Sequence, residues 1–420
     1  MHPDAEARSL TGRIGAMDAV RGFALLGILI VHMVEQYLAS PPPPSEPDLG
    51  LLIPTDGVVR VVVALLFVGK FFALFSLLFG VSFVIQLDRA ARRGLPFARR
   101  FAWRLAILFA FGMVHHLFYR GDILAIYAAL GFLLLPLYRA GDRVLLWVAA
   151  ALALGAHRVP LALHAWSTGG GVAIVPVDEA ALNAYFAAVR SGSLTALFAS
   201  NLTDGVTTKL YFQFGWMGRG WQTLALFVLG LYIGRRRLHE RLTDLRQPLA
   251  RLAWGGLAVS LAMPLLLALA FLGGITPASA DDARPWHFFV ALGMYDVFNL
   301  GVMAALGAGF LLLYTGRMHG ALRPFEAVGR TALTTYVAQS AIGTAIYYGF
   351  GLGLLGRIPL TFAFLLGCVI FAGQMAASAL WLRYFRSGPL EWLWRSLTDG
   401  RLPPLQRGGT SGALLPGANP

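Results

Sequence analysis

The stretch VVRVVVALLFVGKFFALFSLLFGVSF, residues 58–83, decides the fold class of this chain. It is longer than the ~20 apolar residues that cross the ~30 Å hydrocarbon core of a bilayer as a helix. Its only charged residues are Arg60 and Lys70. A lysine in the middle of such a run either breaks it into two helical pieces at Gly69 or lines a cavity. The stretch therefore predicts a membrane span that tilts or breaks.

The rest of the chain has the same character. Of its 420 residues, 57% are hydrophobic and 13% are charged, and the mean hydropathy is +0.66. A soluble domain usually carries about 25% charged residues, so this chain has too little polar surface to cover a soluble core. We predict an all-α, polytopic transmembrane helix bundle that forms one domain over residues 1–402. Residues 403–420, rich in Gly and Pro, are predicted to be a disordered cytoplasmic tail.

Apolar runs predict about ten spans, with boundaries good to a few residues. They lie at roughly 16–38, 57–87, 98–118, 122–138, 143–161, 215–234, 251–273, 287–315, 329–354 and 359–383. The first run could be mistaken for a cleaved signal peptide. It is longer than a typical signal core and contains Asp18 and Arg21, which favours an uncleaved first helix.

The net charge of +13 comes from arginine clusters between the apolar runs. The two largest clusters are Arg89, Arg92, Arg93, Arg99, Arg100 and Arg104, and Arg235, Arg236, Arg237, Arg241, Arg246 and Arg251. Clusters of this kind are typical of cytoplasmic loops in a bacterial inner membrane, not of nucleic-acid binding. They place both termini in the cytoplasm and the segment 162–214, with an amphipathic stretch near 179–190, outside. Cys368 is the only cysteine, so no intrachain disulfide and no cysteine-based metal site is expected.

Ionisable residues within spans are candidates for function, because charge in a bilayer is costly unless it is paired or wet. On the first predicted helix Asp18, Arg21, His32 and Glu35 project within an arc of roughly 100° at ~3.6 residues per turn. The alternative is that Asp18 and Arg21 pair locally and anchor the helix end, and that His32 makes an interhelical hydrogen bond. Both interpretations stay open.

The short connection GMVHHLFYRGDILAIY, residues 112–127, concentrates polar side chains. A His near an Asp is the usual arrangement of a general base, because the carboxylate fixes the tautomer and raises the basicity of the ring. Gly121 lets the chain turn so that Asp122 can approach His115. A polar hairpin tip that satisfies its own hydrogen bonds is the alternative. The candidates here are His115, His116, Tyr119, Arg120 and Asp122.

Three other spans carry polar residues. Lys70 is a candidate for binding an anionic group as a point charge. Asp296 and Asn299 lie in the eighth span, and the ninth places Thr331, Thr335 and Gln339 at i, i+4 spacing. Hydroxyl stripes of this kind are most often contacts between helices.

Four groups of motifs resemble one family. They are MDAVRGFALLGILIVH (17–32), KFFALFSLLFGVSF (70–83), GMVHHLFYRGDILAIYAALG (112–131), and GRTALTTYVAQS (329–340) with GPLEWLWRSLT (388–398). In this order, over nearly the whole chain, they resemble the YeiB-like family, also called domain of unknown function 418. The D-x-x-R-G pattern of the first helix is similar to that of membrane acyltransferases of the acyltransferase-3 and heparan-α-glucosaminide N-acetyltransferase types.

The resemblance implies transfer of an acyl group, such as acetyl, from cytoplasmic acyl-CoA to an acceptor, often a sugar, across or at the membrane. Arg21 and His32 reproduce the R-x10-H spacing of acyltransferase-3 proteins, although members with this pattern often carry Asn where His32 stands. His115 and Asp122 match the G-x-x-H and G-D-I-L strings and are therefore the stronger catalytic candidates, ahead of His32 and His116. The family analogy concerns the fold and does not by itself establish a function.

Two functions follow as hypotheses. In an acyltransferase, acyl-CoA is a co-substrate and no cofactor or metal is permanently bound. Its binding candidates are Arg21, Lys70, Asp18, Tyr119, Arg120 and Gln339. In a transporter or exporter, the same buried polar residues would bind a small solute. The absence of an obvious inverted repeat favours the acyltransferase. The expected partners are the lipid bilayer and a small-molecule acceptor such as a glycan, and a homodimer is an open alternative to a monomer.

Overall fold

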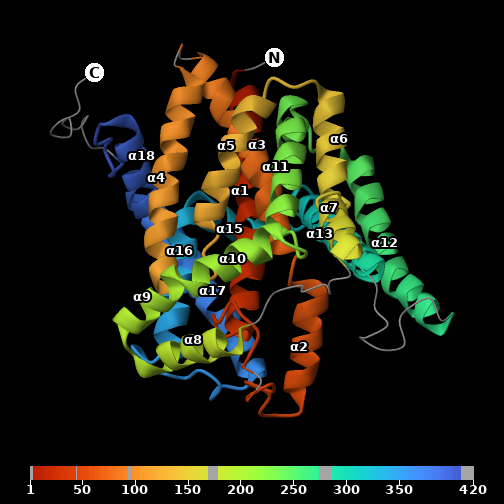
Figure 1. Cartoon of the computed structure of the whole chain (residues 1–420). Coiled ribbons are helices and arrows are strands. Elements are labelled where there is room, and N and C mark those ends of the chain that lie inside the picture. The colour runs from red at the N-terminus through yellow and green to blue at the C-terminus, as the bar shows by residue number, and fades with distance from the viewer. Residues whose placement is uncertain are drawn as a thin grey trace.

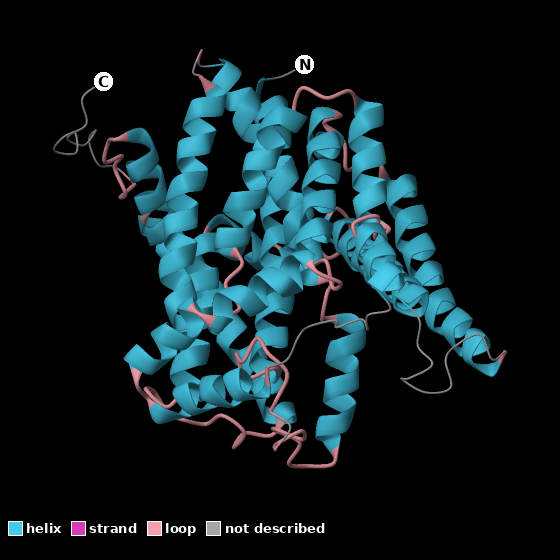
Figure 2. Cartoon of the chain, viewed as in Figure 1, coloured by secondary structure: helices cyan, strands magenta, loops and turns pink. Residues whose placement is uncertain are grey.

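A computed structural model of the chain describes residues 3–407, except residues 44, 93, 95, 169–177 and 274–284. This part of the chain is all-helical, with one isolated antiparallel bridge between Phe385 and Gln406 (Figure 2). Leu405 O accepts a hydrogen bond from Arg386 N, and Arg407 N donates one to Tyr384 O. Residues 405–407 of the predicted tail are therefore held against residues 384–386. The rest of that tail, residues 408–420, lies outside the described residues.

The helices of the first half begin with the long α1. They end with three short helices that follow residues 169–177, which lie outside the described residues. Their bounds are α1 (Pro3–Val34), α2 (Thr55–Leu66), α3 (Phe71–Arg92), α4 (Phe97–Phe118), α5 (Leu124–Leu137), α6 (Asp142–Ala153), α7 (Arg158–Thr168), α8 (Glu179–Ser191), α9 (Leu194–Leu202) and α10 (Asp204–Phe214).

The helices of the second half include the two longest after α1. Their bounds are α11 (Arg219–Arg235), η1 (Leu238–Glu240), α12 (Arg246–Leu272), α13 (Pro285–Tyr314), α14 (His319–Leu322), α15 (Pro324–Arg330), α16 (Ala332–Tyr347), α17 (Leu360–Tyr384) and α18 (Pro389–Asp399).

Helix α1 lies in the middle of the bundle, with α3, α13, α15, α16 and α17 around it (Figure 1). Its small and branched side chains are fully enclosed, and Ala24, Leu25 and Leu29 are each 0% exposed. The polar side chains of α1 are less enclosed, and those of Asp18 and Arg21 are 14% and 22% exposed.

The predicted break in the second span is confirmed. Helix α2 ends at Leu66 and α3 begins at Phe71, and Gly69 between them has φ +87°, a conformation that favours glycine. Lys70 Nζ donates hydrogen bonds to Ala64 O (2.9 Å) and Val68 O (2.7 Å). Lysine here satisfies carbonyl groups at the C-terminal end of α2, where a positive charge also stabilises the helix dipole.

The predicted span 143–161 is also in two pieces. Helices α6 and α7 meet at a bend of 43°, and Gly155 at the bend has φ +86°. Arg158 at the start of α7 donates from Nε to Trp216 O (2.7 Å), so the bend is tied to the segment that precedes α11.

Six helices or helix pairs among the described residues are long and apolar enough to cross a membrane, or seven if α6 and α7 form one bent span. They are α1 from Gly15, α2 with α3, α4, α12, α13 and α17. The other three predicted spans correspond to α5, α11 and α16, which are 14, 17 and 16 residues long. Each is shorter than the ~20 residues of a straight span. The run 329–354 was predicted too long, because α16 ends at Tyr347 and Gly353 and Gly356 adopt positive φ in the turns that follow.

The arginine clusters gather at one end of the bundle. Arg235 Nη1 donates to Ala140 O (2.7 Å), Arg236 pairs with Asp142 (2.7 Å), and Arg100 pairs with Asp399. The α3–α4 connection, the α5–α6 connection and the end of α11 consequently lie at the same end of the bundle, at the top of Figure 1.

The opposite end is formed by α2, α8, α9 and the loop after α1. The predicted amphipathic stretch is helix α8, whose apolar residues Leu182, Tyr185, Phe186 and Val189 are buried. Asp178 Oδ1 accepts from Ala180 N (2.9 Å) and Ala181 N (3.3 Å), which caps the helix. Arg190 forms a two-pronged ion pair with Glu46 (2.6 Å), so α8 is joined to the loop after α1.

Candidate functional site

The turn between α4 and α5 brings His115 and Asp122 together. Helix α4 ends at Phe118, and Asp122 N donates to Tyr119 O (3.2 Å) to close a tight turn. The carboxylate of Asp122 accepts from the backbone N–H groups of Leu124 and Ala125, both at 3.1 Å, and so caps the start of α5. The same carboxylate lies 2.8 Å from His115 Nδ1. These capping hydrogen bonds hold the Asp122 carboxylate where it contacts His115 Nδ1.

This geometry leaves one nitrogen of His115 free. An ionised carboxylate can only accept, so Nδ1 of His115 donates to Asp122, and in the neutral ring Nε2 then presents a lone pair. His115 is 7% exposed, and Nε2 has no hydrogen-bond partner among the described residues. A neutral imidazole with a carboxylate on one nitrogen and a free lone pair on the other is the arrangement of a general base.

His116 is arranged differently. Lys209 Nζ donates to its Nδ1 (2.8 Å), and its Nε2 donates to Asn201 O (2.8 Å). Both ring nitrogens are occupied, so this histidine has no free position for a substrate proton. Lys209 is also 3.8 Å from Asp122 Oδ2, which adds a positive charge behind the His115–Asp122 pair. Burial lowers the pKa of Lys209 to about 8, although Asp122 opposes the shift.

Arg120 joins the turn to the short helices on its other side. Its Nε donates to Asn201 Oδ1 (3.3 Å), its Nη2 donates to Ser200 Oγ (2.9 Å), and its guanidinium lies 3.6 Å from the ring centroid of Tyr185. These contacts bind the turn to α8 and α9. Arg120 therefore positions the turn, and its Nε and Nη2 donors are occupied by protein.

The end of α1 faces the same turn. His32 lies 5.3 Å from the Tyr119 ring, and the Tyr119 ring lies 6.0 Å from that of His115. His32 and His115 are close enough to act electrostatically on one another. Neither His32 nor Glu35, one turn further along, has a hydrogen-bond partner in the described part of the chain, and Glu35 is exposed. His32 and Glu35 are thus free polar groups beside the His115–Asp122 pair.

The chain after α1 is held in an unusual backbone conformation. Gln36, Tyr37 and Ala39 all have positive φ, at 50°, 58° and 51°. Tyrosine hydroxyls satisfy the carbonyl groups of this turn, with Tyr347 donating to Met33 O (2.9 Å) and Tyr348 to Tyr37 O (2.8 Å). Non-glycine residues in this region cost of order 1–2 kcal/mol each, so the surrounding tyrosines stabilise a turn that would not form alone.

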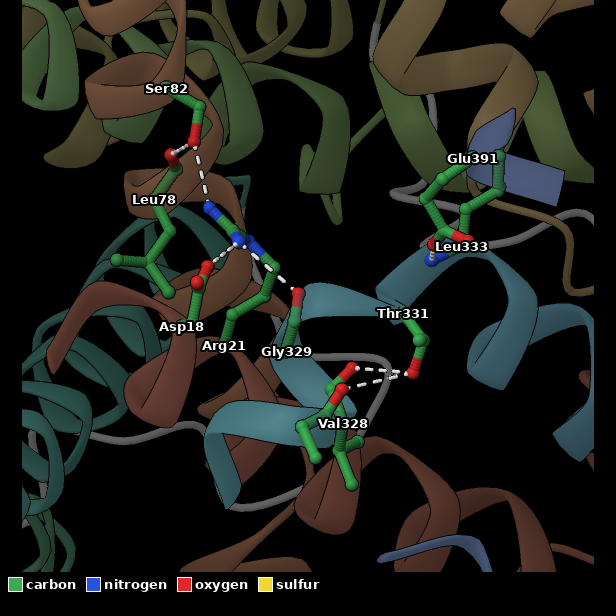
Figure 3. Close-up of polar contacts among 10 residues, drawn as sticks. Asp18, Arg21, Leu78, Ser82, Val328, Gly329, Thr331, Leu333 and Glu391 are labelled. Atoms are coloured by element: carbon green, nitrogen blue, oxygen red, sulfur yellow. Dashed lines mark hydrogen bonds and ion pairs between the residues drawn. The ribbon is translucent and has the colours of Figure 1, made fainter. Parts of the chain in front are cut away.

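Arg21 and Asp18 form a separate group, shown in Figure 3. Arg21 Nη1 donates to Asp18 Oδ1 (2.6 Å) and to Gly329 O (3.2 Å), and Nη2 donates to Ser82 Oγ (3.0 Å). The pair therefore joins α1 to α3 and to the end of α15. At 1.5 Å per residue, Arg21 is about 16 Å along α1 from His32. Arg21 and the His115–Asp122 pair cannot contact the same small group.

The two strings of the fourth motif group, residues 329–340 and 388–398, also meet, on the right of Figure 3. Glu391 of α18 accepts from Leu333 N (2.6 Å) and Thr334 N (3.1 Å), which caps the start of α16. Further along α16, Gln339 Nε2 donates to Gln374 Oε1 of α17 (3.0 Å) and to Leu25 O (3.4 Å). Gln339 thus joins three helices, and its Oε1 has no partner among the described residues.

A second polar centre lies around the break between α2 and α3. Arg158 of α7 and Asp296 of α13 form an ion pair of 2.7 Å, with exposures of 1% and 2%. Arg219, at the start of α11, donates to Tyr295 Oη (3.1 Å) and Gln222 Oε1 (3.3 Å). The sequence pointed to Asp296 and Asn299 here but not to Arg158, Arg219 or Lys209. Arg158 and Arg219 lie near the ends of the predicted spans 143–161 and 215–234, and Lys209 lies between spans, so each could be assigned to a span end or a loop. No group of three or more His, Cys, Asp or Glu residues that could hold a metal ion occurs among the described residues.

These observations define a multi-pass, all-helical membrane protein with two buried polar centres. A family described as "Protein of unknown function (DUF418)" matches residues 233–401 of this chain. The matched region runs from the end of α11 to α18 and does not include His115 or Asp122.

Distant bacterial relatives match nearly the full length. The uncharacterized protein YxaH of Bacillus subtilis is 29% identical, over 92% of this chain and 94% of the relative. The uncharacterized protein YeiB of Escherichia coli is also 29% identical, over 91% of this chain and 95% of the relative. No solved structure matches the chain.

Proposed function

We propose that the chain is a membrane acyltransferase, which moves an acyl group, such as acetyl, from acyl-CoA to a hydroxyl or amine of a small acceptor, such as a sugar. The free Nε2 of His115, beside the 2.8 Å contact of Nδ1 with Asp122, carries this proposal. A base of this kind contributes typically 10²- to 10⁴-fold to a proton-transfer step.

In the proposed reaction the acceptor oxygen or nitrogen bonds to the carbonyl carbon of the thioester while its proton passes to His115 Nε2. The bond between that carbon and the CoA sulfur then breaks, and the proton passes from the imidazolium to the sulfur. Asp122 stabilises the imidazolium and holds its orientation. Lys209 stays next to Asp122, and the Tyr119 ring lies between those of His32 and His115, at 5.3 Å and 6.0 Å.

Arg21 and Asp18 belong to the proposal as residues near the CoA phosphates, not near the reacting atoms. The Arg21 side chain is 22% exposed and lies toward the end of the bundle where the arginine clusters gather. An extended acyl-CoA could place its phosphates there and its thioester further along α1. Lys70 is a weaker candidate for binding the CoA phosphates, because two of its three N–H donors bind backbone carbonyls.

The orientation of the chain is part of the proposal. Basic loops face the cytoplasm in inner membranes. The meeting of the α3–α4, α5–α6 and α11–η1 connections at one end supports cytoplasmic termini and about ten spans, with α5, α11 and α16 as short ones. Acyl-CoA would then reach the protein from that side of a bacterial inner membrane.

A solute transporter is the second candidate. The break between α2 and α3, the bend between α6 and α7 and the buried Arg158–Asp296 pair favour it, because broken helices and buried charges mark solute pathways. A transporter would move its solute across a vesicle membrane without an acyl donor.

The test is transfer of radiolabelled acetyl from acetyl-CoA by the purified protein, with sugars and amines as acceptors. We expect His115→Ala to lower turnover at least ~10²-fold while acetyl-CoA still binds. His116→Ala is the matched control and is expected to keep most of the turnover, because its ring nitrogens bind protein groups. Equal turnover in His115→Ala and the wild type, or no acetyl-CoA binding at millimolar concentration, would overturn the proposal.

A further inference from the structure

Helices α3 and α11 run parallel and begin at the same level. A Cβ on Gly80 would lie 2.9 Å from Gly230 Cα, and a Cβ on Gly234 would lie 2.8 Å from Val84 Cβ. Position 80 therefore faces position 230, and position 84 faces position 234. Ten residues earlier on each chain are Lys70 and Gly220, so the starts of α3 at Phe71 and of α11 at Arg219 are side by side.

Two parallel helix starts create a positive region. The first N–H groups of each helix have no partner within the helix, and each helix start carries a partial positive charge of about half a unit. Arg219 adds a full charge. Its hydrogen-bond partners Tyr295 and Gln222 are neutral, and no carboxylate lies within ion-pair distance of it among the described residues.

Asn299 of α13 points into this region without a partner. It is 1% exposed, and neither Oδ1 nor Nδ2 has a hydrogen-bond partner in the described part of the chain. A Cβ on Gly69 would lie 2.9 Å from Asn299 Oδ1 and 3.1 Å from Arg219 Nη1, so the amide and the guanidinium lie next to one another beside this glycine. A buried amide without partners costs about 1–3 kcal/mol per unpaired group, which a bound ligand would recover. A half turn of the Asn299 amide exchanges Oδ1 and Nδ2, so that Nδ2 takes the place of Oδ1 beside Gly69 and Arg219.

The charged side chains around this space carry a net charge of +1, which one anionic group would neutralise. Lys70, Arg158 and Arg219 are cationic, while Asp296 and Glu35 are acidic, which leaves one positive charge when all five are ionised. A guanidinium and an amide N–H together match the two oxygens of a planar carboxylate. We propose that the space between Gly69, Arg219 and Asn299 binds the carboxylate group of a small solute.

The end of α1 connects this site with the surroundings of His115. Glu35 is exposed and interacts electrostatically with Arg219, which is itself 7% exposed. His32, one turn earlier on α1, interacts in the same way with His115. A carboxylate-bearing acceptor could therefore be held at Arg219 near the histidine. That use of the site rests on the proposed function, but the anion site itself does not.

The test uses the purified full chain in detergent and measures its melting temperature with acetate as the probe. Acetate is expected to raise the melting temperature, whereas acetamide, a neutral molecule of similar shape, is not. Asn299→Asp places a carboxylate beside Arg219. This variant is expected to melt no lower than the wild type and to lose at least tenfold in apparent acetate affinity.

Two further variants and inorganic phosphate as a second anion complete the test. Asn299→Leu removes the donor without adding charge and is expected to lose the same acetate effect. An unchanged acetate effect in both variants, or equal effects of acetate and acetamide, would overturn the site. A larger effect of inorganic phosphate than of acetate would overturn the assignment to a carboxylate. His115→Ala is expected to keep the acetate effect while it loses acetyl transfer, so failure of either proposal can be recognised separately.

Discussion

His115 and His116 show how neighbouring residues take different roles. One faces Asp122 and keeps a free nitrogen, while the other is held between Lys209 and Asn201. Successive helical residues differ by about 100° in direction, so the two rings reach different elements. The identity of the free histidine depends on which elements pack on each side of α4.

Lys209 provides a prediction for pH dependence. Burial lowers its pKa to about 8 in the folded protein, against ~10.4 for an ordinary lysine in the unfolded chain. Between these values the unfolded state binds the proton and the folded state does not, so stability rises as the pH rises through this window. The contribution is at most about 1.4 kcal/mol per pH unit.

We expect the wild type to gain melting temperature from pH 8 toward pH 10 relative to Lys209→Met, which lacks the titrating group. Lys209→Arg is the control for the positive charge and should also lack the gain, because arginine stays protonated in this range. The measurement is thermal unfolding in detergent across this pH range. Parallel curves for the wild type and Lys209→Met would contradict the prediction.

At the scale of elements, the crossing of α3 and α11 aligns the two helix starts. A Cβ on Gly230 would lie 2.2 Å from Leu77 O and 2.9 Å from Gly80 Cα, which are backbone atoms and cannot move aside. Close approach of this kind through small residues is typical of membrane helix pairs.

Gly230→Ala should therefore force the helices apart and destabilise the protein by about 1–3 kcal/mol, as overpacking does. Gly373→Ala on α17 is the matched control, since a Cβ there meets no atom within 4 Å. The melting temperature is expected to fall in Gly230→Ala and to stay level or rise in Gly373→Ala. The same readout could show the acetate effect weakened in Gly230→Ala, because the two helix starts would no longer be aligned. Equal melting of both variants would argue against the close crossing.

The whole molecule has a basic end and an opposite end that carries the loop after α1 and α8. Arg236 and Asp142 meet at the first, and Arg190 and Glu46 at the second. Their positions at opposite ends of the bundle predict that the basic end faces the cytoplasm and that the other end faces outward.

Single cysteines can test this orientation, because Cys368 is the only native cysteine and can be replaced by serine. Asp48 and Thr243 are both exposed, the first in the loop after α1 and the second between η1 and α12. In intact cells a membrane-impermeant maleimide should label Asp48→Cys. Thr243→Cys should react only after the membrane is opened. The reverse pattern would show that the orientation is inverted.

Several features could be predicted from local pattern. Residues 58–83 predicted the membrane span and offered a break at Gly69 as one of two alternatives, because uninterrupted apolar length and a Gly–Lys step act within one segment. Helix α8 was predicted for the same reason, from its periodic apolar residues. Asp122 could be placed near His115, because seven residues and a glycine turn bring the two side chains within reach. The short spans α5, α11 and α16 differ from the prediction in length, because turns and caps end a helix before its apolar run stops.

The sequence by itself determined the class of the protein and its family resemblance, because hydropathy and charge clusters are local properties. It offered the pair His115–Asp122 as one of two alternatives, and the contact itself is a result of the structure. Only the tertiary structure decided which groups remain free and which cations share a site. Lys209 lies 93 positions from His116, and Arg219, Gly69 and Asn299 come from three separate elements. Their contacts depend on the packing of parallel helices, and the free energy of that packing comes from the whole bundle and not from any one segment.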